Sequence, residues 1–316
     1  MQHVLVTGGA GFIGSRLVRE LVRKGVAVRV FDNLSSGRAD NLKDIEDLIE
    51  LVEGDIRDLV ACKEACQGID IVFHMAALVS VPQSVADPIG SDAINSGGSL
   101  NVLVASRDCS VKRLVFSSSA AIYGETVIVP VNERATPSPT SPYGVQKLTS
   151  EHYARNFALL YGLETVSLRY FNAYGPGQDP ASPYAAAIPK FLMRLLRDES
   201  PIVFGDGEQT RDFCYVDDIV AANLCAASAP REAARGSAYN IASGSQISIN
   251  RLLPLIQECL GTSIPIRYEP EREGDIKHSG ADISAATNHL AFRPAISLEE
   301  GLRRTTEYYR ALVSCK

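Results

Sequence analysis

Short apolar runs alternate along the first half of the chain with segments whose apolar residues recur at helical spacing. Between the first two runs, GFIGSRLVRELVRKG carries an apolar face of Ile13, Leu17 and Leu21, and Gly25 ends the predicted helix. Apolar strands joined by helices indicate a doubly wound parallel sheet covered on both faces. The runs that predict strands, all rich in Val and Ile, are HVLVTGG, AVRVFDN, IELVEGD, IDIVFHMAA, KRLVFSSS and ETVSLRYFN.

The pattern changes beyond about residue 172. The Gly- and Pro-rich AYGPGQDPASP is followed by a helix-like IPKFLMRLLRD, by short strands and turns, and by a final helix LEEGLRRTTEYYRAL. The sequence therefore predicts an α/β protein with a Rossmann-type domain in residues 1–172 and a smaller α/β substrate domain in residues 173–316. Some segments of the second part are expected to return and pack on the first.

Composition narrows the range of functions. The chain has 316 residues and a formal net charge of -6, without a long basic run, which argues against general nucleic-acid binding and against a membrane-surface role. The sequence has no signal-like start and no run of roughly 20 apolar residues, so a cytoplasmic enzyme is expected. Seven scattered cysteines without CxxC pairs predict free thiols and no metal site.

The first strand leads directly into TGGAGFIG, which places Gly8, Gly11 and Gly14 between a strand and a helix. Glycines at these positions let the backbone approach a pyrophosphate at the helix N-terminus. Asp32 follows Gly14 by eighteen residues, at the end of the second strand. A carboxylate there accepts hydrogen bonds from ribose hydroxyls and repels a 2′-phosphate, so the pattern predicts NAD rather than NADP.

Asp55 follows the third predicted strand in EGDIRD. Two interpretations carry equal weight. Asp55 either contacts the adenine amino group or is the N-cap of the helix expected in DLVACKEACQG.

Tyr143 and Lys147 lie four residues apart in SPYGVQK, and Tyr143 is the only one of the twelve tyrosines with lysine at i+4. In a helix the two side chains share one face, and an ammonium near a phenol favours the phenolate. We expect Lys147 to lower the pKa of Tyr143 and so make it a usable base. The alternative is an ordinary helix start, in which Pro142 sets the first turn and Lys147 points into water. Ser119, at the end of KRLVFSSS, is a candidate partner for a reacting hydroxyl.

The glycine loop, the serine strand and YxxxK together resemble the extended short-chain dehydrogenase/reductase superfamily over nearly the whole chain. The resemblance implies that Tyr143 is the acid/base, that Lys147 tunes it and holds the nicotinamide ribose, and that Ser119 orients the substrate hydroxyl. It also implies an NAD site formed by Gly8, Gly11, Phe12, Ile13, Gly14, Asp32, Asn33, Ser35, Ser36, Gly37, Asp55, Ile56, Ala76, Ala77, Asn95, Ser117, Tyr143, Lys147 and Tyr170.

The residues after the serines indicate which reaction is catalysed. Dehydratases of the superfamily carry an acidic pair there, whereas this chain has Ala120 and Ala121. Dehydration would therefore lack a proton donor for its leaving hydroxyl. Epimerisation needs no such donor, because hydride leaves C4 to give a transient 4-keto sugar and then returns to the other face.

The segments RYFNAYGPGQDP, VFGDGEQTRDFCYVDD and EREGDIKHSGAD resemble the UDP-sugar 4-epimerases in order and spacing. The resemblance implies that Asn172, Arg211 and Arg272 bind the diphosphate, with Phe204 near uracil and Asp275 near its ribose. Planar guanidinium groups suit phosphate oxygens, although either arginine alone would be an ordinary surface residue. The implied UDP-sugar site comprises Ser80, Ser119, Tyr143, Asn172, Ala186, Val203, Phe204, Arg211, Arg272, Asp275 and Ser279.

Ser279 is the position that bears on the choice of sugar. By resemblance it lines the pocket beside the sugar C2 substituent, where epimerases restricted to glucose and galactose carry tyrosine. The segments AALVSVPQS and QDPASPYAAAIPKF also resemble the group that accepts N-acetylated sugars. The expected substrates are UDP-N-acetylglucosamine and UDP-N-acetylgalactosamine, with UDP-glucose and UDP-galactose as additional ones. The alternatives are an epimerase of plain sugars only, a reductase or dehydrogenase, a non-catalytic NAD sensor, and a solvated Ser279 that never meets substrate.

The helix that begins at Tyr143 continues as EHYARNFALLYG, with more apolar residues than one stripe needs. In the superfamily this helix packs in an intersubunit four-helix bundle, so a homodimer is expected. The alternative is that these residues are buried inside the monomer.

Overall fold

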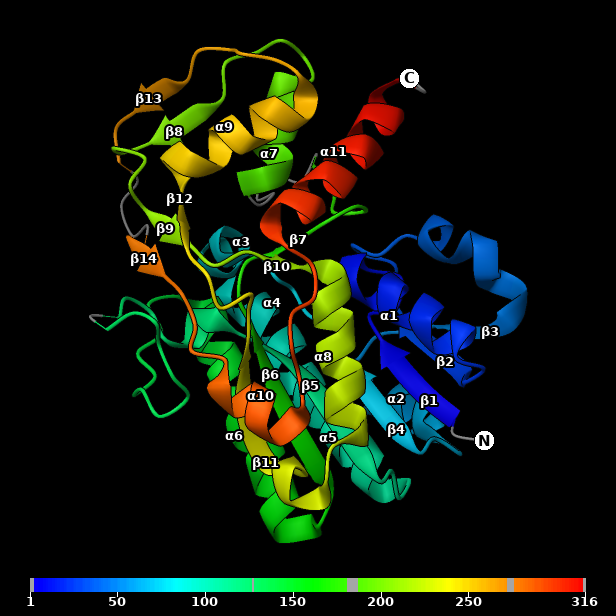
Figure 1. Ribbon diagram of the computed structural model, residues 1–316. Helices are drawn as coiled ribbons and strands as arrows, with labels where there is room; N and C mark the ends of the chain where they lie inside the picture. Colours follow the sequence, from blue (N-terminus) through cyan, green and yellow to red (C-terminus); the bar gives the residue numbers. More distant parts are fainter. Residues whose placement is uncertain (1–2, 127, 181–186, 272–275, 315–316) are drawn as a thin grey trace.

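A seven-stranded parallel sheet forms the centre of the larger lobe (Figure 1). The computed structural model describes residues 3–126, 128–180, 187–271 and 276–314. The strand order is β11-β6-β5-β4-β1-β2-β3, and every neighbouring pair is parallel. The strands are β1 (His3–Thr7), β2 (Ala27–Asp32), β3 (Ile49–Glu53), β4 (Ile71–His74), β5 (Arg113–Ser119), β6 (Glu164–Tyr170) and β11 (Arg235–Ile241). The six predicted strands and the doubly wound fold class are confirmed.

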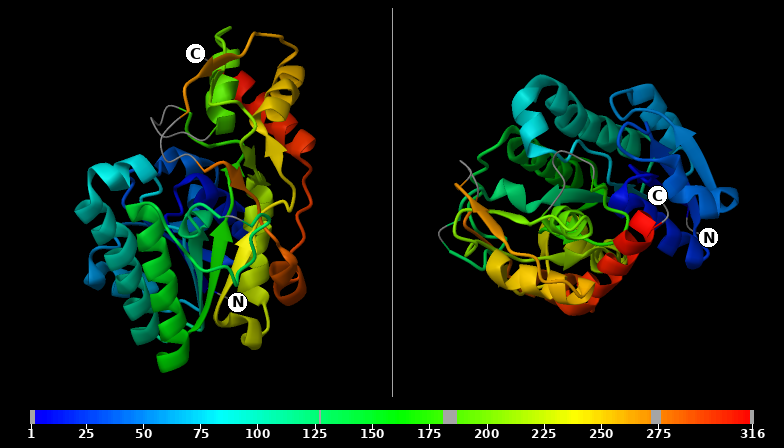
Figure 2. Two further views of the ribbon diagram at one scale, coloured as in Figure 1. Left: turned by 90° about the vertical axis from the view of Figure 1, so that its left-hand side faces the viewer. Right: turned by 90° about the horizontal axis from the view of Figure 1, so that it is seen from above.

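Helices cover both faces of this sheet, as the two views in Figure 2 show. Successive side chains of β1 point to opposite faces: Val4 and Val6 pack with α1 and α8, whereas Leu5 packs with α2, α5 and α6. The first face carries α1 (Phe12–Arg23), α8 (Val216–Ser228) and α10 (Ser284–Leu290), and the second carries α2 (Leu59–Cys66), α5 (Ser99–Asp108) and α6 (Pro142–Tyr161). Near β3 lies the irregular helix η1 (Ala39–Leu48).

Helix α6 has the start that the sequence predicts. Ser141 is its N-cap and accepts a hydrogen bond from the Gly144 amide at 3.2 Å, while Pro142 occupies the first turn. Gly162 ends the helix with a φ of +73°, a conformation that glycine adopts without a Cβ penalty. The helix therefore presents Tyr143 and Lys147 from its first two turns.

A smaller lobe lies over the carboxyl edge of the sheet (Figure 2). Its core is formed by three helices, α7 (Ala187–Leu195), α9 (Ile249–Leu260) and α11 (Leu298–Ser314). Short strands complete it: β7 (Ala173–Tyr174) with β10 (Cys214–Tyr215), β8 (Ile202–Phe204) with β13 (Arg267–Glu269), and β9 (Thr210–Arg211) between β12 (Ile247–Ser248) and β14 (His278–Ser279). The remaining short elements are α3 (Val81–Ala86), α4 (Pro88–Asp92), η2 (Ala93–Gly98), η3 (Ala120–Ile122) and η4 (Arg231–Ala234).

Some elements from beyond residue 172 belong to the larger lobe. Strand β11 pairs with β6 at the edge of the main sheet, α8 packs with α1, and α10 packs on β11 and α8. The sequence analysis allowed for such returning segments without identifying them. Within the described residues, none of the helices combines the length and the apolar character that a membrane crossing requires.

From β1 the chain adds β2 and β3 on one side, and then adds β4, β5 and β6 on the other side, so the strand order reverses between β1 and β4. In doubly wound sheets, ligands bind in the crevice that opens at this point, outside the carboxyl ends of the strands. The main cleft of the protein lies there.

Candidate active site

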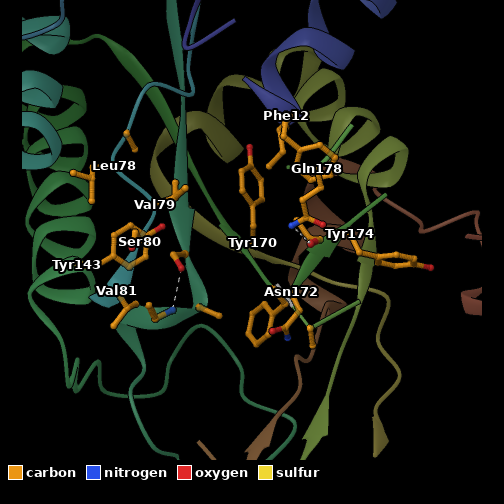
Figure 3. A pocket seen from close by; sticks show the side chains of 18 of the residues that line it. Phe12, Leu78, Val79, Ser80, Val81, Tyr143, Tyr170, Asn172, Tyr174 and Gln178 are labelled. Atoms are coloured by element: carbon orange, nitrogen blue, oxygen red, sulfur yellow. Dashed lines mark hydrogen bonds between the residues drawn. The ribbon is translucent and has the colours of Figure 1, made fainter. Parts of the chain in front are cut away.

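One cleft of about 1890 Å³ runs between the two lobes. Single-ligand pockets usually measure about 300–1,000 Å³, so this cleft has room for a dinucleotide and a second ligand together. In Figure 3, Tyr143 and the loop with Leu78 and Ser80 face Tyr170 and Asn172 across the cleft. Both lobes therefore contribute to one site.

The turn between β1 and α1 fits the pyrophosphate of a dinucleotide. A Cβ at Gly14 would lie 2.1 Å from the Gly8 carbonyl oxygen, and a Cβ at Gly8 would lie 2.6 Å from the Ala76 amide nitrogen. Gly8 also has a φ of +68°. Among the described residues, no side chain caps the N-terminus of α1, so its amides face the cleft as an anion site.

Asp32 lies at the end of β2, 7% exposed, on the wall of the cleft. Its carboxylate accepts hydrogen bonds from the amides of Ala10 and Leu34, each at 2.9 Å. These bonds hold the carboxylate beside the glycine turn, where the ribose of a bound NAD would lie.

Asp55 lines the same end of the cleft. Asn33 donates a hydrogen bond to it at 2.9 Å, and hydrogen bonds from Arg57 hold the pKa of Asp55 far below its usual range. The alternative prediction for Asp55 is wrong: the N-cap of α2 is Asp58, whose side chain accepts from the amides of Val60 and Ala61.

Ser119, Tyr143 and Lys147 come together at the carboxyl end of β5. The Ser119 side chain lies beside Tyr143 and lowers the pKa of its hydroxyl, and the Lys147 ammonium donates to the Ser117 carbonyl at 2.8 Å. The Lys147 nitrogen lies 5.9 Å from the centre of the Tyr143 ring and 5.0 Å from that of Phe116. Lys147 is 3% exposed, so the alternative in which it points into water is wrong.

The pKa of Tyr143 shifts in the direction opposite to the one predicted. Burial raises it to about 12, and the hydrogen bond from Ser119 only partly opposes this effect. Burial also lowers the pKa of Lys147 to about 7, while the Glu151 carboxylate raises it. Desolvation dominates because the ammonium is directed at the Ser117 carbonyl rather than at the phenolic oxygen. Burial therefore favours the phenol form of Tyr143, so the phenolate that accepts a proton is its minor form.

The cleft brings together almost all of the residues predicted for the site. Ala186, Arg272 and Asp275 lie outside the described residues. The predicted residues that line the cleft are Gly8, Gly11, Phe12, Ile13, Gly14, Asp32, Asn33, Ser35, Ser36, Gly37, Asp55, Ile56, Ala76, Ala77, Ser80, Ser117, Ser119, Tyr143, Lys147, Tyr170, Asn172, Val203, Phe204, Arg211 and Ser279.

Asn95 does not line the cleft and is 1% exposed. Its side chain accepts from the Leu78 amide at 2.8 Å and donates to the Leu78 carbonyl at 3.0 Å and to Gln146 at 2.8 Å. In this structure it holds the loop that carries Ala77 and Ser80 rather than facing a ligand. Burial of this kind leaves no signature in the sequence.

The small lobe adds cleft residues that the sequence analysis missed. Gln178 and Gln209 line the wall, as do Lys190 and Arg194 of α7. Lys190 and Arg194 are spaced i, i+4 in IPKFLMRLL, so the helical pattern could have shown that they share a face. The two glutamines lie in loops, where no periodicity applies.

Asp212 lies behind the cleft wall that holds Asn172 and Ser279 and forms hydrogen bonds with both. It is fully buried, and its carboxylate accepts from the Ser243 hydroxyl at 2.6 Å and from the amides of Ser243 and Gly244. Its amide donates to the Ser279 carbonyl at 2.9 Å, and its carbonyl accepts from Asn172 at 2.9 Å. The hydrogen bonds of Asp212 thus fix Asn172 and the backbone of Ser279 relative to each other.

The fold and this site define a dinucleotide-dependent enzyme of the short-chain dehydrogenase/reductase type. The family profile described as "NAD dependent epimerase/dehydratase family" matches residues 4–242. The chain belongs to this family, and its nucleotide cofactor is NAD.

Solved structures of similar proteins agree with this assignment. The chain is 41% identical to the UDP-glucose 4-epimerase of Thermotoga maritima with UDP-glucose (TM-score 0.93, covering 99% of this chain and 100% of that one). It is 42% identical to the UDP-N-acetylglucosamine 4-epimerase of Methanobrevibacter ruminantium in complex with UDP-N-acetylmuramic acid (TM-score 0.93, covering 98% of this chain and 99% of that one). It is 34% identical to the Thermus thermophilus UDP-glucose 4-epimerase complexed with NAD (TM-score 0.88, covering 98% of this chain and 99% of that one).

Proposed function

We propose that this chain, a UDP-sugar 4-epimerase, interconverts UDP-N-acetylglucosamine and UDP-N-acetylgalactosamine and also accepts UDP-glucose and UDP-galactose. The observation that carries the choice of sugar is a small side chain, Ser279, on the wall of the cleft that also holds Tyr143 and Ser119. The relatives act on both kinds of sugar by their descriptions, so the proposal rests on this residue.

The chain's own groups supply the proton chemistry. NAD, when bound, accepts the hydride of the sugar C4 atom and returns it. Tyr143 exchanges a proton between its phenolic oxygen and the C4 oxygen, while Ser119 orients that oxygen through its hydroxyl. Lys147 and the glycine turn would hold the nicotinamide ribose and the pyrophosphate.

The segment after β5 supports epimerisation over dehydration. Ala120 and Ala121 both line the cleft, in the short turn η3 that follows Ser119. Neither side chain can donate a proton to a leaving hydroxyl. The tyrosine and its two partners are therefore equipped to remove and restore the proton of the C4 hydroxyl.

The proposal is tested with the full chain as purified, incubated with UDP-N-acetylglucosamine and no added nicotinamide cofactor. The appearance of UDP-N-acetylgalactosamine, followed by proton NMR, is expected, because the bound NAD is regenerated in each cycle. A requirement for stoichiometric NAD(P)H would contradict the proposal and favour the reductase alternative. Absence of turnover with every UDP-hexose, with NAD bound, would favour the sensor.

The second part of the proposal is a homodimer formed through α5 and α6. These helices pack against each other, and α6 exposes large apolar side chains: Val145 is 50%, Leu159 58% and Leu160 72% exposed. The alternative prediction that these side chains are buried within the monomer is wrong. A second copy of the chain that covers this face would complete a four-helix bundle.

Light scattering at micromolar concentration is expected to give twice the mass of the chain. Leu160→Glu should shift the protein to the monomer, because a charge would be buried in the bundle. Leu312→Glu, at a 37% exposed position on α11, is the matched control and should leave the dimer intact. A wild-type monomer would exclude this interface.

A further inference from the structure

Three residues on one face of α6 bind the three serines that end β5. Tyr143, Lys147 and Glu151 follow one another at i, i+4 and i+8. Tyr143 lies beside Ser119, and Lys147 donates to the Ser117 carbonyl. The third contact, from the Ser118 hydroxyl to Glu151 at 2.5 Å, has no part in the proton transfer described above.

Glu151 is paired with Arg169 of β6 in the interior. The two side chains are each 7% exposed, and Arg169 donates to both carboxylate oxygens, at 2.9 Å and 2.8 Å. Arg169 also donates to the Tyr123 hydroxyl at 2.7 Å, which donates to Asn240 of β11 at 2.7 Å. The network therefore ties α6 to three neighbouring strand segments directly behind the cleft.

We propose that Glu151 and Arg169 are positioning residues, which hold Lys147 and the serine end of β5 in place for the proton transfer at Tyr143. The inference rests on the proposed function. A buried ion pair is weak evidence for stability as such, since its desolvation offsets its attraction. Its position one turn after Lys147, and its bond to the serine between Ser117 and Ser119, point instead to control of the site.

The charge of Glu151 gives this arrangement a measurable effect. Burial of Lys147 disfavours its ammonium form, and the Glu151 carboxylate raises the pKa of Lys147 against that effect. Burial lowers the pKa of His74 to about 3, so this neighbour is neutral. The titratable and charged groups that interact with Lys147 are Tyr143 and Glu151 on α6 and His74 on β4. Behind Glu151 lies Arg169 on β6, which contacts Tyr123 and Glu133 after β5.

Two substitutions should shift the pKa of Lys147 in opposite directions. Glu151→Gln keeps the shape but removes the anion, so the pKa of Lys147 should fall. Arg169→Gln removes the neighbouring cation, so the pKa of Lys147 should rise. The pKa is measured in the full-length protein without substrate, from the carbon NMR shift of labelled lysine. The Lys147 signal is identified by its loss in Lys147→Met.

The pH dependence of kcat should shift in the same directions as the pKa of Lys147. For Glu151→Gln, the decline of kcat with rising pH should begin at lower pH. For a fall of one unit from about 7, the protonated fraction drops about ninefold at pH 8 and about twofold at pH 6, so the loss relative to wild type should be about fivefold greater at pH 8. For Arg169→Gln the decline should begin at higher pH.

Glu164→Gln is the matched control. It breaks the Arg113–Glu164 pair, which joins β5 and β6 at their amino-terminal ends, away from the cleft. It should lower stability and leave both the pKa of Lys147 and the pH profile unchanged. Unchanged or same-direction shifts in the two test variants would overturn the inference. If Glu151→Gln does not fold, the direction in Arg169→Gln decides alone. If UDP-sugar turnover is absent, the proposed function fails, whereas the NMR titration still tests the inference.

Discussion

Tyr143→Phe is expected to lower turnover by at least ~10²-fold, the usual contribution of a general acid/base group. The substitution removes only the hydroxyl, which exchanges the proton with the sugar and lies beside Ser119. The ring is 8% exposed and the Tyr143 amide donates to Ser84, so the packing and this backbone bond remain. Turnover is measured with UDP-N-acetylglucosamine, and NAD content by absorbance after release.

The NAD content should be that of wild type, because the glycine turn and Asp32 are untouched. Tyr308→Phe is the matched control on α11, where the ring is 39% exposed and lies outside the cleft. It should turn over normally. Near-normal activity of Tyr143→Phe would remove Tyr143 from the mechanism.

Ser279→Tyr should largely abolish turnover of the acetylated pair and retain activity on UDP-glucose. Ser279 lies on β14, which pairs with β9 beside Arg211, and its backbone is fixed by Asp212. The larger side chain would fill the space that an acetamido group needs. Overpacking costs about 1–3 kcal/mol, which corresponds to roughly a 5- to 150-fold loss. Parallel kcat/KM measurements on both substrate pairs provide the test.

Ser279→Ala separates size from polarity and should keep both activities, because it leaves the space open. If Ser279→Tyr loses both activities equally, or if wild type epimerises only plain sugars, Ser279 does not select the sugar. The 4-epimerase assignment would survive either result.

The main sheet was predictable to the extent that its strands are apolar on both faces. β4 and β5 contain IVF and LVF, and this continuity is typical of strands buried between helices. β11 escaped prediction because RGSAYNI contains Arg, Gly, Ser and Asn and has a register shift between Arg235 and Ser237. An edge strand has only one neighbour, so its sequence is less constrained.

The site was predictable where its functional residues directly follow strands. Gly14, Asp32 and Ser119 follow apolar runs at fixed places, so their convergence at one edge follows from the parallel sheet. The protonation of Tyr143 was not predictable in this way. It depends on how completely Tyr143 and Lys147 are removed from water, and that is decided by distant segments packing together.

The path of the chain between the lobes has a consequence for any attempt to divide the protein. The backbone leaves the larger lobe after β6, comes back as α8 and β11, leaves again for α9, and returns once more as α10 before α11. A fragment that stops at residue 172 would lack β11, and β6 would present unpaired amides and carbonyls along a bare edge. The two lobes are thus interleaved along the chain, and a cut at residue 172 leaves neither piece with a complete lobe.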